Sequence, residues 1–201
     1  MKKIGVLISG RGSNLQSILD AQKEPRFPGK VVVVISNKQG VQGLERAKKV
    51  DIATHVVDNK EYESRTAHED AIAQLLFQYE VELVVLAGYM RLLSPLFLKK
   101  FPDCVINIHP SLLPAFPGMC GQRQALEYGV RISGCTTHFV DEGEDTGPII
   151  LQKAVPILQD DDESSLTERI LAEEHKIMVE SVRLWCEGKL RLEGRHVHIL
   201  E

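Results

Sequence analysis

The sequence predicts an α/β fold, in which an open and mostly parallel sheet carries flanking helices. Apolar, β-branched runs that fit strands alternate with amphipathic segments that fit helices. Residues 31–35 and 83–87 are apolar without a break, as expected of parallel strands that are covered on both faces. In the run from 136 to 140, Thr136, His138 and Val140 alternate with Thr137 and Phe139, and another apolar run follows at 149–156. These two runs predict an added antiparallel edge in the C-terminal part.

The first half of the chain predicts a repeated order of strand and helix, which is typical of a Rossmann-like sheet. A tight turn, Gly10-Arg11-Gly12-Ser13-Asn14, separates the first strand from the first helix. The strand expected at residues 53–57 is short and is typical of a sheet edge. The strands are expected at residues 3–9, 30–36, 53–57 and 83–87, and the helices after residue 14 and at 43–50 and 67–79.

The second half predicts a fifth strand, a Pro-rich loop, the two antiparallel strands and one long helix. Ser94-Pro95 is typical of a helix start. The acidic run at 160–163 predicts a solvated linker, and its negative charge also suits the N-terminus of the helix that follows. The remaining elements are expected at residues 104–109, 122–128, 136–140, 149–156 and 165–185, with a hairpin or tail at 188–201.

Composition limits the classes of protein that the chain can be. With 201 residues and 43% hydrophobic content, one core and a single domain over 1–201 are expected. The net charge of −4 and the lack of a basic stripe argue against a nucleic-acid partner. The N-terminal apolar run is too short for a signal peptide or a membrane span, so we expect a cytoplasmic protein. Four widely spaced cysteines predict reduced thiols and no metal site.

The stretch from Asn107 to Pro114 ends an apolar run with an amide and an imidazole on alternate residues. In a strand, Asn107 and His109 point to the same side. Pro110 should end the strand, because proline cannot donate to a ladder and disfavours helix at the preceding residue. Two interpretations stay open here. His109 either binds a buried carbonyl at a strand end, or it faces a loop-lined cleft together with Asn107.

The turn after the first strand has the chemistry of an anion site. Glycines allow close backbone approach, and a helix start exposes unpaired N–H groups and a partial positive charge. Gly12, Ser13 and Asn14 are therefore candidates for binding a phosphate. The pattern is neither the dinucleotide fingerprint nor a Walker motif. In the alternative interpretation, Ser13 is simply the N-cap of the helix.

Three further features are open to two interpretations. The loop from Gly88 to Pro95 carries large apolar residues that either pack in the core or form the wall of a pocket for a flat apolar group. Asp145 begins an Asp-Thr-Gly-Pro turn and either faces solvent or the cleft. Glu174 lies within the apolar stripe of the last long helix, where a carboxylate needs a partner. That partner is a nearby Arg or Lys, or an amine or hydroxyl of a substrate.

Four stretches together resemble the phosphoribosylglycinamide formyltransferases, the folate-dependent enzymes of purine synthesis. They are residues 8–14, 87–91, 107–114 and 145–148, and they span nearly the whole chain. The resemblance implies formyl transfer from 10-formyltetrahydrofolate, as co-substrate, to the primary amine of glycinamide ribonucleotide. It implies small-molecule partners and no metal, and it leaves room for a homodimer. By the same resemblance, residues 1–100 form a phosphate- and nucleotide-binding half and residues 101–201 a catalytic and folate-binding half.

The resemblance also assigns roles to individual positions. Asn107, His109 and Asp145 match the catalytic trio, and Gly12, Ser13 and Asn14 match the phosphate loop. Glu174 matches the acidic residue that binds the glycinamide part of the substrate. The folate-binding positions are Arg65, Leu86, Met90, Arg91, Leu92 and Val140, with Arg65 expected to meet the acidic tail. One stretch departs from the pattern, because Cys120 and Gln122 stand where many members carry two histidines.

The expected chemistry agrees with these positions. An amine that attacks a formyl carbon builds negative charge on oxygen, which an amide donor and an imidazolium can stabilise. A carboxylate beside the histidine favours its charged form and can accept the ammonium proton. Two alternatives are another formyl-folate enzyme and a non-catalytic Rossmann-type module. Methionyl-tRNA formyltransferase and formyltetrahydrofolate hydrolase each carry a further domain, for which we expect no room here. If the chain is instead a non-catalytic module, its fold should not bring Asn107, His109 and Asp145 together.

Overall fold

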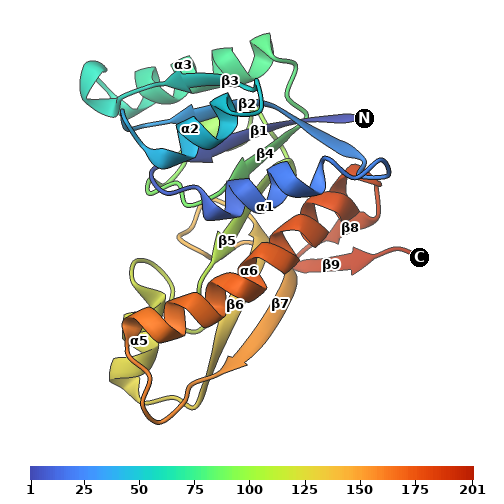
Figure 1. Ribbon diagram of the computed structural model, residues 1–201. Coiled ribbons are helices and arrows are strands. Elements are labelled where there is room, and N and C mark those ends of the chain that lie inside the picture. Colours follow the sequence, from blue (N-terminus) through green and yellow to red (C-terminus); the bar gives the residue numbers. More distant parts are fainter.

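A computed structural model describes all 201 residues and contains a seven-stranded sheet in the order β3-β2-β1-β4-β5-β6-β7 (Figure 1). Strands β1 to β5 run parallel, whereas β6 pairs antiparallel with both β5 and β7. The predicted class, a mostly parallel sheet with an antiparallel edge, is confirmed. The strands are β1 (Lys2–Ile8), β2 (Gly29–Ser36), β3 (Ala53–Val56), β4 (Leu83–Leu86), β5 (Val105–His109), β6 (Ile132–Phe139) and β7 (Ile149–Pro156).

Six α-helices connect or follow these strands, and the predicted C-terminal hairpin is present as β8 and β9. The last long helix begins earlier than predicted, because Asp162 and Ser165 form a reciprocal capping box. The end of the acidic run therefore forms the start of α6, with Asp162 as the N-cap and Glu163 as the first helical residue. The elements are α1 (Ser13–Ala21), α2 (Gln42–Lys48), η1 (Asn59–Glu61), α3 (Arg65–Gln78), α4 (Pro95–Leu98), α5 (Gly121–Tyr128), α6 (Glu163–Cys186), β8 (Leu190–Glu193) and β9 (His196–Ile199).

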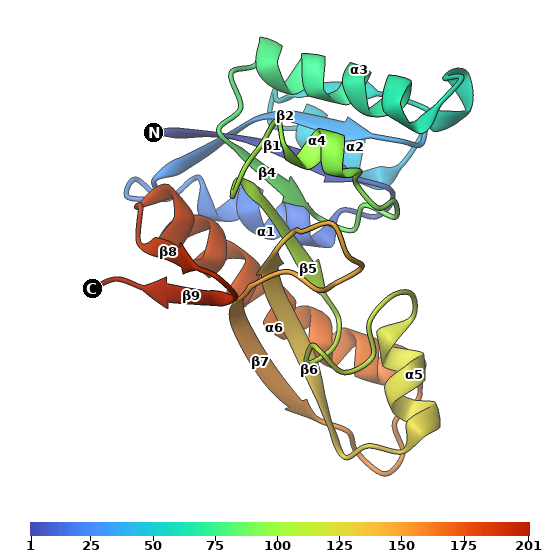
Figure 2. The ribbon, with the colours of Figure 1, turned by 180° about the vertical axis from the view of Figure 1, so that it is seen from behind.

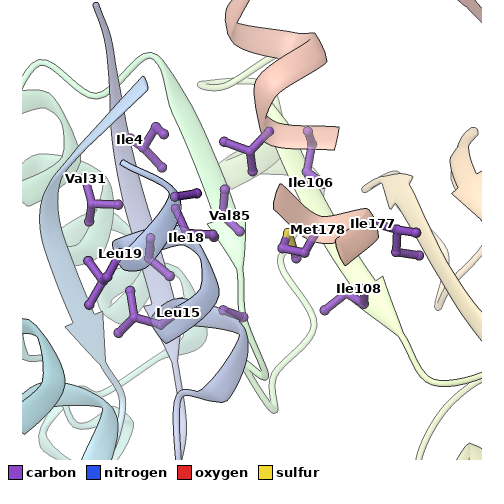
Figure 3. Packing of buried hydrophobic residues seen from close by; sticks show 14 of the residues in the cluster. Ile4, Leu15, Ile18, Leu19, Val31, Val85, Ile106, Ile108, Ile177 and Met178 are labelled. Carbon is purple, nitrogen blue, oxygen red and sulfur yellow. The ribbon is translucent and has the colours of Figure 1, made fainter. Parts of the chain in front are cut away.

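Two hydrophobic clusters hold the helices on opposite faces of the sheet. On one face, α1, α2 and α6 share a cluster of 27 buried residues. Figure 3 shows Leu15 and Ile18 of α1 lying over Ile4, Val31 and Val85 of the sheet. On the other face, α3 and α4 cover the sheet, as Figure 2 shows from behind. Each fully buried aliphatic side chain contributes about 1.5–3 kcal/mol. The sheet is thus a rigid support for the loops at its ends.

The functional elements lie where the parallel strands end. The loops after β1, β4 and β5 emerge at the same edge, as the carboxyl ends of parallel strands do. The antiparallel β6 adds a fourth contribution, because its register places His138 opposite Asn107. None of the helices has the length and apolar character that crossing a membrane would require.

Candidate active site

A cavity of about 590 Å³ opens at the ends of β4 and β5. The three residues expected to be catalytic, Asn107, His109 and Asp145, all line it. Five of the six residues expected to bind folate line it as well: Leu86, Met90, Arg91, Leu92 and Val140. The structure therefore brings together residues that come from three separate stretches of the chain, 86–92, 107–109 and 140–145.

His109 is nearly buried and is bound at both ring nitrogens. Its Nε2 lies 2.8 Å from the carbonyl oxygen of Phe116, and its Nδ1 lies 3.1 Å from Oδ2 of Asp145. Both interpretations of this residue hold at once, since His109 binds a buried carbonyl and also lines the cavity. Because a carbonyl and a carboxylate only accept hydrogen bonds, this arrangement is best satisfied by an imidazolium that donates to both.

Asp145 reaches the cavity because of an unusual turn. Its backbone has φ 54°, in the left-handed region, and a Cβ on Gly147 would lie 1.8 Å from the Phe139 carbonyl oxygen. Only glycine fits there. The turn directs the carboxylate to the backbone N–H of Gly118 at 2.8 Å and to Nδ2 of Asn107 at 3.4 Å. Asp145 therefore faces the cleft and not open solvent.

The charges of His109 and Asp145 support each other. Burial opposes ionisation of Asp145, but hydrogen bonds from His109 and the Gly118 N–H, together with the charge of His109, outweigh it and hold its pKa well below the ordinary range. Burial likewise lowers the pKa of His109, but the hydrogen bond and charge of Asp145 more than offset this effect. The pKa of His109 is consequently raised above 6.5. The pair favours imidazolium and carboxylate together.

His138 is a member of this network that sequence reasoning did not single out. Its Nδ1 lies 2.8 Å from the carbonyl oxygen of Phe139, so this nitrogen is the donor. Its Nε2 then accepts from Nδ2 of Asn107 at 3.2 Å. The Asn107 amide nitrogen, expected to face a substrate oxygen, is thus partly engaged by the protein. The only signal for His138 in the sequence is its place in the alternating run at 136–140.

A second cavity, of about 280 Å³, lies beside the first and shares Gly88, Met90, Gln122 and Thr167 with it. The expected phosphate residues line this cavity. The N-cap of α1 is Gly12, with φ 69°, and it makes no side-chain cap. Ser13 is the first helical residue, so the interpretation of Ser13 as the N-cap is wrong. The first residues of α1, whose N–H groups have no partner within the helix, therefore line this cavity.

Glu174 lines the same cavity opposite the start of α1. Its partner is neither Arg nor Lys, because Nδ2 of Asn14 donates to its Oε2 at 2.8 Å. Burial raises the pKa of Glu174, and the hydrogen bond from Asn14 only partly opposes this effect. Oδ1 of Asn14 is itself buried without a partner. This corner of the site therefore holds polar groups that the protein leaves incompletely satisfied.

Three remaining residues lie at the margins of the site. Arg65, at the start of α3, does not line the large cavity. Its guanidinium instead binds Glu69 and the carbonyl oxygen of Leu92. Cys120 and Gln122, the positions that depart from the family pattern, both line the cavity, and Cys120 is exposed. No group of three or more His, Cys, Asp or Glu side chains is arranged to hold a metal ion.

Comparison with known proteins agrees with this geometry. Residues 2–182 match the family model described as formyl transferase. The chain is 43% identical to the phosphoribosylglycinamide formyltransferase of Escherichia coli, over 94% of this chain and 89% of that protein. The crystal structure of glycinamide ribonucleotide transformylase 1 from Symbiobacterium toebii superposes with a TM-score of 0.98 at 56% identity, covering 100% of this chain and 95% of that one.

Some relatives are much longer. The chain is 47% identical, over 96% of its length, to the trifunctional purine biosynthetic protein adenosine-3 of Chironomus tentans. It spans only 14% to 19% of the length of this and similar trifunctional relatives. The match nevertheless covers nearly all of this chain. The chain belongs to the formyl transferase family, and within that family it groups with the phosphoribosylglycinamide formyltransferases.

Proposed function

We propose that the chain transfers a formyl group from 10-formyltetrahydrofolate to the primary amine of glycinamide ribonucleotide, in de novo purine synthesis. The observation that carries the proposal is the meeting of Asn107, His109 and Asp145 in one cavity. A second cavity, which has the start of α1 and Glu174 in its wall, adjoins it. One site can therefore hold the two substrates with their reacting groups close together.

The reaction follows from the charges of the catalytic network. The substrate amine attacks the formyl carbon, and negative charge develops on the formyl oxygen. The imidazolium of His109 and the amide of Asn107 stabilise that charge. For a direct hydrogen bond, the formyl oxygen replaces the Phe116 carbonyl as acceptor of the His109 Nε2 proton. The ammonium proton passes to Asp145, directly or through water, and this same proton is then delivered to N10 of the folate as the bond between N10 and the formyl carbon breaks.

Each half of the chain contributes to the binding of both substrates in this proposal. In residues 1–100, the N–H groups of Gly12, Ser13 and Asn14 bind the phosphate. In residues 101–201, the catalytic trio lies beside the folate, and Glu174 binds the glycinamide part. The folate ring packs against an apolar wall that Leu86, Met90, Leu92 and Val140 supply.

The test is an absorbance assay of the purified protein with a 10-formyl folate, with and without glycinamide ribonucleotide. Formyl loss that requires the amine is the expected result. Loss of formyl without the amine would indicate formyltetrahydrofolate hydrolysis instead. A protein that binds phosphate but releases no formyl under either condition would support the non-catalytic module.

A further inference from the structure

We infer that Glu69, acting together with Arg65, is a positioning residue that fixes the folate-facing loop, which we define as residues 88–94. The inference rests on the proposed function and names a determinant of folate binding that does not touch the folate. Glu69 lies on α3, behind the loop, and is not part of the cavity lining. Figure 2 shows α3 beside α4, the helix into which the loop continues.

Glu69 is a buried carboxylate whose two oxygens are both occupied by hydrogen-bond donors. Its side chain is 4% exposed. Oε1 accepts from the backbone N–H of Ser94 at 3.0 Å and from Nε of Arg65 at 2.9 Å. Oε2 accepts from the hydroxyl of Ser94. A buried acid with this many partners contributes more to positioning than an exposed ion pair does.

Arg65 extends the contact to a second point of the loop. While Nε binds Glu69, Nη2 donates to the carbonyl oxygen of Leu92 at 2.7 Å. Ser94, which Glu69 holds, also accepts from the N–H of Phe97 and caps α4. The C-terminal end of the folate-facing loop is thus tied at Leu92 and at Ser94 by one ion pair.

The other end of the loop is tied to Ser9, the residue that follows β1. The N–H of Ser9 donates to the carbonyl oxygen of Gly88 at 3.0 Å, and Oγ of Ser9 accepts from the N–H of Met90 at 2.8 Å. Although their backbones are held in this way, the residues Met90 and Leu92 remain 54% and 56% exposed and line the cavity. Large apolar side chains at a surface tend to pack onto the core. A fixed loop backbone therefore keeps these two side chains in the cavity wall, where a ligand can contact them.

This arrangement gives Arg65 a different role from a contact with the acidic folate tail. Its guanidinium is used by Glu69 and Leu92, whereas that of Arg91, which lines the cavity, makes no ion pair. If Arg65 acts by holding the loop, its loss weakens the binding of any formyl folate. If it binds the tail, its loss weakens only folates that carry the glutamate.

The experiment compares Glu69→Ala and Arg65→Ala by steady-state kinetics, with a 10-formyl folate and with an analogue that lacks the glutamate. We expect the KM for both compounds to rise about tenfold, which corresponds to about 1.4 kcal/mol, because a buried hydrogen-bond network loses one of its partners. The kcat and the KM for glycinamide ribonucleotide should change less than twofold. Glu69→Asp should recover most of the loss. The matched control is Asp70→Ala, which removes the adjacent acid on α3, an exposed partner of Lys100.

Several results would overturn the inference. These are an unchanged KM for folate in Glu69→Ala, an equal loss in kcat and in both KM values, or an Arg65→Ala defect confined to the glutamate-bearing compound. If Glu69→Ala does not fold, Glu69→Gln keeps an acceptor for Ser94 and should raise the KM for folate about threefold.

A second measurement separates this inference from the proposed function. If the wild-type protein transfers no formyl, the proposed function fails, and amide hydrogen exchange across residues 91–94 still tests the positioning role. Exchange there should be at least about tenfold faster in Glu69→Ala than in wild type, and unchanged in Asp70→Ala. Equal exchange in Glu69→Ala and wild type would show that the acid does not hold the loop.

Discussion

The two ends of the site differ in how completely the protein satisfies its own polar groups. Around Asp145, each carboxylate oxygen has protein partners, and His109 is bound at both ring nitrogens. Around Glu174, the carboxylate has one amide partner and no ion pair, and Oδ1 of Asn14 is buried without a partner. The first region is organised by the fold itself. The second has capacity for hydrogen bonds that a ligand can complete.

The two carboxylates therefore have opposite pKa shifts within one site. Hydrogen bonds lower the pKa of Asp145 in spite of burial, whereas burial raises that of Glu174. Pairs of acids whose surroundings separate their pKa values are typical of sites that move protons. The comparison predicts that removing charge at Asp145 disrupts chemistry, and that removing it at Glu174 changes binding and stability.

The largest effect is expected for Asp145→Asn. The variant keeps the shape of the side chain but loses the charge that favours the His109 imidazolium and the acceptor for the ammonium proton. Turnover should fall at least about a hundredfold, while both substrates still bind. Single-turnover kinetics and equilibrium binding of each ligand check this expectation. Glu142→Gln, an exposed acid of the same loop, is the control and should retain turnover. Unchanged turnover in Asp145→Asn would remove this residue from the mechanism.

A smaller and different effect is expected for Glu174→Gln. Loss of a charged partner should raise the KM for glycinamide ribonucleotide about tenfold, with a smaller change in kcat.

The same substitution should increase the stability of the protein at pH 7. A carboxyl whose pKa is raised by folding binds more protons in the folded state, so stability falls as pH rises from about 4.3 through the folded pKa. The variant should therefore be more stable than wild type at pH 7 in urea unfolding. A less stable variant would contradict this account of Glu174.

The difference between the two regions also explains what could be read from the sequence. Asn107 and His109 were visible because a strand places alternate residues on one side. The partnership of Asn14 with Glu174 joins residues 160 positions apart, and no local pattern encodes it. The contact of Asn107 with His138 depends on the register of β5 against β6, which the sequence does not specify.

The alternation of strands and helices predicted the sheet, because the spacing of apolar residues that distinguishes a strand from a helix is a local property of the chain. Other features needed the folded chain. The αL turn at Asp145 depends on how closely Gly147 approaches Phe139. The hydrogen bond from Arg65 to the carbonyl oxygen of Leu92 joins residues 27 positions apart, and no local pattern encodes it. Local rules thus predicted the elements, whereas the partners of the site residues required tertiary structure.

The start of α1 gives a prediction about stability. At Gly12 a Cβ would lie 2.7 Å from the Cα of Gly43, and φ is 69°. Gly12→Ala should lower the free energy of unfolding by about 1–3 kcal/mol and weaken phosphate binding. Gly194→Ala is the control for the cost of the left-handed backbone alone. At Gly194 φ is 59°, and no atom lies within 4 Å of the position that a Cβ would take. Equal losses in the two variants would show that α1 and α2 separate easily at this contact.

The state of His109 is the central claim about the catalytic region. Because its folded pKa is raised, the stability that His109 contributes is fully present below about pH 6.5 and is lost as pH rises through the folded pKa. An NMR pH titration of histidine-labelled protein measures this pKa directly, in wild type and in Asp145→Asn. We predict a His109 pKa above 6.5 in wild type and a lower value in the variant. A wild-type value below 6.5 that the variant leaves unchanged would contradict the account.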